Sequence, residues 1–120
     1  MRVGIDVLDV VRMQKFLQNE RFLDKYFTKY EAMYVANNIR KTQSLAGIYA
    51  AKEAFLKALG IGIGHGIELN EIEVRHEPSG KPYIELSKSA KIILATHKLT
   101  DIQISISHTD EVCTAICILN

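Results

Sequence analysis

The sequence predicts an α+β fold, in which a small, largely antiparallel sheet packs on a long helix and shorter helices. Apolar and polar residues alternate in the stretches 2–8, 101–109 and 111–119, and such alternation is typical of strands. The stretch 42–59 instead keeps the helical period. Only a short turn joins the last two strands, which favours antiparallel pairing.

The first half of the chain is predicted to contain one strand and several helices. Three apolar residues of the first strand alternate with Gly4 and Asp6. A short helix is expected over 10–17. Thr28 with Glu31 three residues later matches a capping box, so a further helix should begin near Thr28.

The long helix is predicted to run from Thr42 to Leu59 and to end at Gly60, since glycine commonly follows the last helical residue. A glycine-rich loop comes next. The stretches 68–77 and 83–86 are separated by the turn "PSGKP", and this pattern favours a hairpin.

The end of the chain is predicted to be an amphipathic helix over 87–99, followed by two strands that the turn "HTDE" connects. Cys113 and Cys117 both lie in the last strand. Four residues along a strand span about 13 Å, so these thiols cannot form a disulfide with each other. They are expected to be core thiols in a reducing compartment.

Length and composition indicate an ordinary globular protein. The 120 residues fit a single domain, 1–120, with 48% hydrophobic and 24% charged residues. No stretch is long and apolar enough to span a membrane, and no secretory signal is recognisable, so a cytoplasmic location is expected. The net charge of +1 gives no reason to expect nucleic acid as a partner.

The charge is unevenly distributed along the chain. Residues 1–60 carry ten Lys or Arg and six Asp or Glu, whereas residues 61–120 carry five and eight. A basic first half suits an acidic partner or a phosphate ligand.

The helix 42–59 carries the first candidate residues. Tyr49, Glu53 and Lys57 form one row, almost opposite the apolar side that holds Ile48 and Phe55. The simplest interpretation is a Glu53–Lys57 pair of the i,i+4 type. A stripe of four alanines beside Glu53 would let another backbone, a ligand or a neighbouring subunit approach. Near the apolar side, the ammonium of Lys52 must either reach water or meet an anion.

Asp6 is the second candidate because it lies within an apolar strand. Burying an aspartate without a partner is costly, so it either points to water or meets a partner on a helix. If that partner is Glu53, a proton or a cation must lie between the two carboxylates. Oxygen-only ligands with room for water favour Mg²⁺. Sequence spacing leaves these alternatives open.

Two further motifs are candidates for catalysis or phosphate binding. In "SISHT" (105–109), Ser107 and His108 could bind phosphate oxygens, but no G-x-S-x-G motif supports a serine hydrolase. A histidine at a strand end is more often structural. The glycines at 60–66 follow a helix, whereas a dinucleotide-binding fingerprint follows a strand. They are better explained as a helix stop and a loop whose backbone a ligand can approach.

Taken together, four segments resemble the holo-acyl-carrier-protein synthase family. "VGIDVLDVVRM" resembles its G-x-D-[IV]-x-x-[IV]-x-R-[IM] motif, and "RFLDKYFTKYE" resembles F-x-x-[KR]-x-[FL]-T-x-x-E. "LAGIYAAKEAFLKALGIGIG" resembles its A-[AV]-K-E-A-x-x-K-A-x-G-x-G helix. "GKPYIEL" and "ISISHTDEVCTAICIL" resemble its G-K-P turn and S-[IL]-[ST]-H strand pair. The segments follow in family order and cover almost the whole chain.

The resemblance implies a Mg²⁺-dependent enzyme that transfers phosphopantetheine from coenzyme A to a serine of apo-acyl carrier protein. Adenosine bisphosphate would be released, and the reaction would support fatty acid biosynthesis. It implies Asp6 and Glu53 as metal ligands and, with Lys57, as catalytic residues. It also implies a homotrimer with its clefts between subunits.

Contacts with the two substrates are expected at further residues. Coenzyme A is expected to contact Lys57, Gly60, Gly62, Ser107 and His108. The acidic carrier protein is expected to bind a set of basic residues in the first half of the chain: Arg12, Lys15 and Arg21, with Lys25 near them. The simpler alternative is that these side chains only form a solvent-exposed helix face. Many members have arginine where this chain has Ile48, so other groups must make that arginine's contacts.

Two other functions remain as alternatives. The chain could bind coenzyme A or a nucleotide without catalysis, although a mere binder does not need two carboxylates around a metal. It could also be a trimeric scaffold in which the Glu53–Lys57 pair is only structural.

Overall fold

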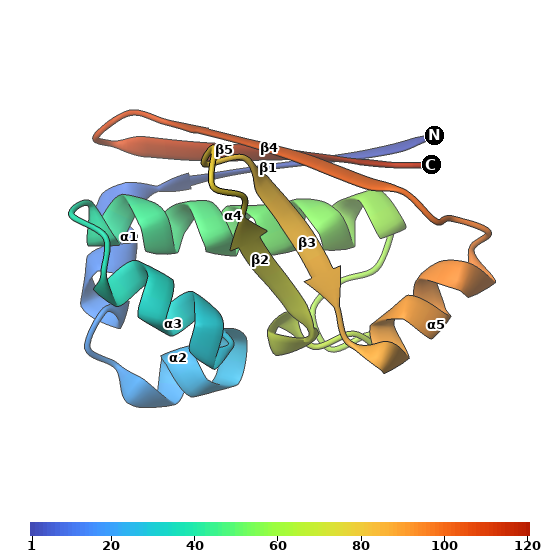
Figure 1. Cartoon of the computed structure of the whole chain (residues 1–120), viewed down its shortest axis with the longest axis horizontal. Helices are drawn as coiled ribbons and strands as arrows, with labels where there is room; N and C mark the ends of the chain where they lie inside the picture. The colour runs from blue at the N-terminus through green and yellow to red at the C-terminus, as the bar shows by residue number, and fades with distance from the viewer.

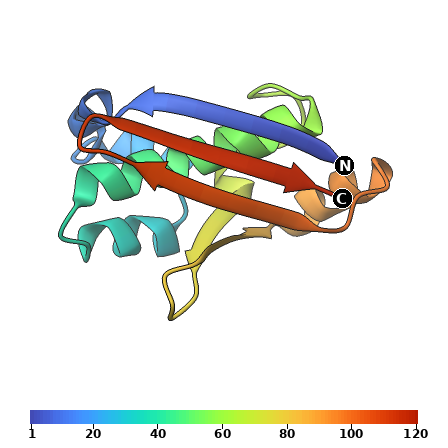
Figure 2. The same ribbon diagram turned by 90° about the horizontal axis from the view of Figure 1, so that it is seen from above.

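A computed structural model describes all 120 residues, with the helix α4 (Lys41–Leu59) at the centre. A three-stranded sheet covers one side of α4, and the remaining elements lie on the other (Figure 1). The sheet has the order β1 (Arg2–Asp9), β5 (Val112–Leu119), β4 (Ile102–His108), and both pairings are antiparallel. Seen from above, its strands run along α4, and both chain termini lie at one end of the molecule (Figure 2).

Short helices follow β1 on the far side of α4. These are α1 (Val10–Met13), the 3₁₀ turn η1 (Gln14–Phe16), α2 (Glu20–Tyr26) and α3 (Lys29–Ala36). The helix α2 was not predicted, although the side chain of Asn19 caps it by accepting a hydrogen bond from the Phe22 amide at 3.0 Å. The capping box at Thr28 is confirmed, and α3 begins where it predicts.

The second half of the chain adds a hairpin and one helix. After the 3₁₀ turn η2 (Leu69–Glu71), the strands β2 (Ile72–His76) and β3 (Pro82–Leu86) form the predicted hairpin. It makes a two-stranded sheet of its own instead of joining the larger one. The helix α5 (Lys88–Thr96) precedes β4. The α+β class with antiparallel pairing is confirmed, but the strands are divided between two sheets.

The predicted apolar side of α4 is confirmed, since Ile48 and Phe55 are buried, and Ala51 and Leu59 are buried with them. Cys113 and Cys117 are free and also buried, as expected. None of the helices is both long and apolar enough to cross a bilayer.

The alanine stripe of α4 faces the chain's own first strand. A Cβ atom added to Gly4 would overlap the backbone of Ala54 and Ala58, so β1 and α4 approach more closely than side chains would permit. The expectation that small residues admit another backbone is correct. The stripe is closed to a ligand or a neighbouring subunit because β1 covers it.

This close packing decides which face of β1 is turned inward. Gly4 and Asp6 face α4, while Val3, Ile5 and Val7 are 52%, 60% and 64% exposed on the opposite face. Of the two alternatives for Asp6, the inward orientation is therefore the correct one.

A completely buried ion pair anchors α4 to the elements below it. Lys52 donates to Glu31 Oε1 at 2.6 Å and to the carbonyl oxygens of Tyr26 and Leu69 at 2.7 and 2.9 Å. Glu31 also accepts hydrogen bonds from the amides of Thr28 and Val74. Lys52 thus meets an anion, which was one of the two arrangements predicted for its ammonium. The sequence did not indicate that the partner is Glu31.

Candidate active site

Asp6, Glu53 and Lys57 come together where β1 crosses α4. Glu53 and Lys57 occupy successive turns of one helix face, and Asp6 projects onto that face from β1. The Nζ atom of Lys57 lies 3.0 Å from Oδ1 of Asp6, and Glu53 takes part in no ion pair within 4 Å. The simple i,i+4 pairing of Glu53 with Lys57 is therefore wrong, because Lys57 bridges to the strand instead.

The carboxylates of Asp6 and Glu53 lie close enough for the charge of one to affect the pKa of the other. Burial raises the pKa of Glu53, and the neighbouring charge of Asp6 raises it further. The nearby hydroxyl group of Tyr49 and the charge of Lys57 lower the same pKa, without reversing the shift. Two acidic groups held in this way attract a cation.

The residues present fit Mg²⁺ better than a metal that needs a full protein cage. Asp6 and Glu53 supply oxygen donors only, and no group of three or more His, Cys, Asp or Glu side chains is placed to hold a metal. Mg²⁺ commonly binds through one or two carboxylates and fills its other positions with water and substrate phosphates.

The glycine loop begins directly after this helix. Gly60 has a φ of 84° and ends α4 in the left-handed conformation, as predicted. Gly60 lies within one turn of Lys57, so the loop containing Gly60 and Gly62 starts next to the predicted catalytic lysine. Their contact with coenzyme A remains a prediction.

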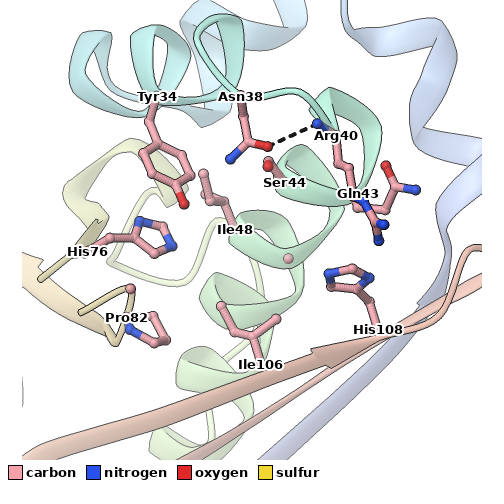
Figure 3. Close-up of a pocket in the computed structure, with 12 residues that line it drawn as sticks. Tyr34, Asn38, Arg40, Gln43, Ser44, Ile48, His76, Pro82, Ile106 and His108 are labelled. Carbon is pink, nitrogen blue, oxygen red and sulfur yellow. Dashed lines mark hydrogen bonds between the residues drawn. The ribbon is translucent and has the colours of Figure 1, made fainter. Parts of the chain in front are cut away.

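A pocket of about 260 Å³ lies on the other side of α4 (Figure 3). It is bounded by α3, the start of α4, the hairpin and β4; the lining residues are Tyr34, Asn38, Arg40, Gln43, Ser44, Gly47, Ile48, His76, Gly80, Pro82, Ile106 and His108. Of the residues predicted to bind coenzyme A, only His108 lines it. Ser107 is exposed on the opposite face of β4, so the strand separates these two neighbours.

The electrostatics of this pocket favour an anion. The helix α4 begins here directly after Arg40, its N-cap residue; it has no acidic residue in its first turn and no side-chain cap on its amides. The positive end of the helix dipole, Arg40 and His108 therefore border one cavity (Figure 3). Sequence reasoning missed Arg40, Gln43 and Ser44, although the basic start of α4 was a usable signal.

One wall of the pocket is an aromatic stack. The rings of Tyr34 and His76 lie 4.0 Å apart and within 3° of parallel (Figure 3). Burial lowers the pKa of His76, and its Nδ1 atom is buried without a hydrogen-bond partner. A flat, neutral wall with an unpaired polar atom suits a heterocyclic ring.

The carboxylate site and the pocket are separated within one chain. At 100° per residue, Ile48 and Ser44 lie roughly 140° and 180° around α4 from Glu53. Asp6 and the pocket residue Ile106 are on the two edge strands, with Ala115 of β5 between them. The structure therefore gathers Asp6, Glu53 and Lys57 but leaves His108 on the far side of the helix.

The predicted carrier-binding residues lie on the consecutive helical elements α1, η1 and α2. Arg12 and Arg21 are exposed, and Arg12 makes only a loose 3.9 Å contact with Asp9. Lys15 and Lys25 lie over the rings of Phe16 and Tyr26, at 5.1 and 5.3 Å from the ring centres. Positive charge and aromatic surface are thus combined on this segment.

The fold, the carboxylate site and the pocket together suit a ligand that is rich in phosphate groups. Similarity to known proteins identifies the family. The sequence model of the 4′-phosphopantetheinyl transferase superfamily matches residues 2–117. A holo-[acyl-carrier-protein] synthase of Cytophaga hutchinsonii is 39% identical over 98% of this chain and 95% of its own. Another from Syntrophus aciditrophicus is 41% identical over 97% and 92%.

Solved structures show the same likeness. The crystal structure of Helicobacter pylori holo-[acyl-carrier-protein] synthase in complex with coenzyme A superposes with a TM-score of 0.85. The two sequences are 28% identical, and the match covers 98% of this chain and 99% of that one. The chain therefore belongs to the 4′-phosphopantetheinyl transferase superfamily and is an enzyme of the holo-acyl-carrier-protein synthase family.

Proposed function

We propose that this enzyme transfers the phosphopantetheine group of coenzyme A to a serine of apo-acyl carrier protein, with Mg²⁺ as cofactor. The observation that carries the proposal is the meeting of Asp6, Glu53 and Lys57 at the crossing of β1 and α4. Adenosine 3′,5′-bisphosphate is the second product. The modified carrier would serve fatty acid biosynthesis.

In this reaction, the serine oxygen forms a bond to the β-phosphorus of coenzyme A, and the bond from that phosphorus to the bridging oxygen breaks. The serine loses its proton, and the bisphosphate leaves with the negative charge. When bound by Asp6 and Glu53, Mg²⁺ would polarise the phosphoryl oxygens and stabilise that charge.

The side chains of this chain contribute positioning and fixed charge. Lys57 brings an ammonium to within 3.0 Å of Asp6, where it can attract the diphosphate. Glu53 could also orient a water that takes the serine proton, a role we rank below its role as a ligand.

The pocket beside Arg40 and His108 suits the adenosine 3′-phosphate end of coenzyme A. Its aromatic wall of Tyr34 and His76 suits a purine, and the start of α4 with Arg40 suits a phosphate. Arg40 also supplies a positive charge near Ile48, where related enzymes are expected to have arginine.

We further propose that the two half-sites meet between subunits of a homotrimer. Within one chain, α4 stands between the carboxylates and the pocket, so one ligand needs two copies to reach both. The outer face of the sheet offers an apolar assembly surface, formed by Val3, Ile5, Val7, Val112 and Ile116.

Mixing two defective variants tests this arrangement. Glu53→Gln damages the carboxylate site and His108→Ala the pocket, and each variant alone is expected to be strongly impaired. Refolded together in equal amounts, they should recover activity in about one quarter of the sites, since some interfaces then combine two intact halves. Activity equal to the sum of the separate variants would show that each site lies within one chain.

The direct test of the reaction is the mass of the carrier protein. Purified enzyme, coenzyme A and Mg²⁺ should increase the mass of apo-acyl carrier protein by one phosphopantetheine group, and a carrier with alanine at the acceptor serine should stay unchanged. Binding of coenzyme A with no mass change would favour a non-catalytic binding protein. The carboxylate pair speaks against that alternative, because binding alone does not need it.

A further inference from the structure

The ammonium of Lys57 lies against one of the two carboxylates that are proposed to bind Mg²⁺. Its Nζ atom donates a hydrogen bond to Oδ1 of Asp6 at 3.0 Å, and this is its only ion pair. The Lys57 side chain is 55% exposed, whereas that of Asp6 is only 14% exposed. Asp6 therefore offers little free surface beside the ammonium.

A second cation at Asp6 has to compete with this ammonium. Mg²⁺ holds its oxygen ligands at about 2.1 Å, so an ion on Oδ1 would lie at most about 5 Å from Nζ. Two positive charges this close to each other repel, and the repulsion is strongest where little water reaches the site. The contact between Lys57 and Asp6 thus opposes binding of the metal at the same carboxylate.

Lys57 can leave this contact more easily than Asp6. Asp6 is fixed on β1, which is paired with β5 along its whole length and packs against α4 at Gly4. Lys57 instead ends a flexible four-carbon chain that is half exposed. A diphosphate bound beside α4 would offer the ammonium more negative charge than one carboxylate does, so Lys57 would move to it.

We propose that Lys57 is an exchangeable counter-ion, which neutralises Asp6 before coenzyme A binds and moves to the diphosphate when coenzyme A arrives. The move frees Asp6 for the divalent cation. This inference rests on the proposed function of Asp6 and Glu53 as Mg²⁺ ligands. Coenzyme A and the metal are then positively coupled, and each raises the affinity of the other by the same factor.

The variant Lys57→Met tests the exchange through metal binding alone. Mn²⁺ is titrated without carrier protein, and the free ion is followed by electron paramagnetic resonance. In the absence of coenzyme A, the variant should bind Mn²⁺ about fivefold more tightly than the unmodified protein, because the competing cation is gone. At saturating coenzyme A, the variant should bind Mn²⁺ no more tightly than the unmodified protein, because Lys57 has then left Asp6.

Lys88→Met is the matched control. Lys88 is an exposed lysine on α5, so this variant loses the same charge and should keep the Mn²⁺ affinity of the unmodified protein in both conditions. Equal tightening in Lys57→Met with and without coenzyme A would show that Lys57 acts only as a fixed charge. That result, or no tightening without coenzyme A, would overturn the exchange and leave the proposed function intact. Absence of Mn²⁺ binding in the unmodified protein with coenzyme A present would overturn both.

Discussion

Replacement of Glu53 by glutamine is expected to lower kcat/KM for carrier modification by roughly three orders of magnitude while the protein keeps its fold. The amide preserves size and shape but removes the negative charge that binds the cation. The same substitution removes repulsion, because burial and the charge of Asp6 both disfavour ionised Glu53. The free energy of unfolding should therefore stay equal or rise slightly.

Two measurements separate these effects. Carrier mass shift against time gives the turnover, and urea unfolding gives the stability of the same preparation. Glu85→Gln serves as the control, since Glu85 is exposed on β3 and makes only a 3.5 Å contact with Lys91. Full activity in Glu53→Gln would remove this carboxylate from the mechanism.

The elements governed by neighbours in the chain were predictable from the sequence. Thr28 and Glu31 set the start of α3 through a local capping box, and Gly60 ends α4 because its backbone adopts a positive φ. The strands β4 and β5 alternate strongly and are joined by a short turn, so their pairing followed as well. Each of these features depends on residues within a few positions of one another.

Contacts between distant segments explain what the sequence left open. Alternation in β1 defines two faces, but only the close approach of Gly4 to α4 decides that Asp6 is turned inward. Lys57 had a local candidate partner in Glu53, and the strand supplied a closer one. The pocket combines residues of α3, α4, the hairpin and β4, so no single stretch of sequence indicates it.

The buried pair of Glu31 and Lys52 is a further contact between distant segments that the sequence did not predict. Lys52 precedes Glu53 directly, and its position in the family motif gives no sign that it points away from the substrates. All three hydrogens of its ammonium have acceptors inside the protein, and the ring of Phe27 lies 4.9 Å away. Burial lowers the pKa of Lys52 and raises that of Glu31, while their mutual attraction opposes both shifts.

Lys52→Met is therefore expected to reduce the free energy of unfolding by about 3–5 kcal/mol, since it leaves the Glu31 carboxylate buried without its cation. That loss is a large part of the stability of an ordinary domain. Urea unfolding should show a midpoint well below that of the unmodified protein. The double variant Glu31→Gln, Lys52→Met should lose about 2 kcal/mol less than the sum of the single variants, because neither charge is then left alone.

Lys57→Met makes the comparison decisive, because it is the same chemical change in the same helix. The Lys57 side chain is 55% exposed and its ammonium contacts only Asp6, which is 14% exposed, so stability should fall by about 1 kcal/mol, well short of the loss in Lys52→Met, while turnover falls strongly. Two lysines five positions apart would then have different roles: Lys52 would anchor α4 in the fold, and Lys57 would act on the substrate. An unfolding midpoint for Lys52→Met equal to that of Lys57→Met would show that the buried pair does not anchor the helix.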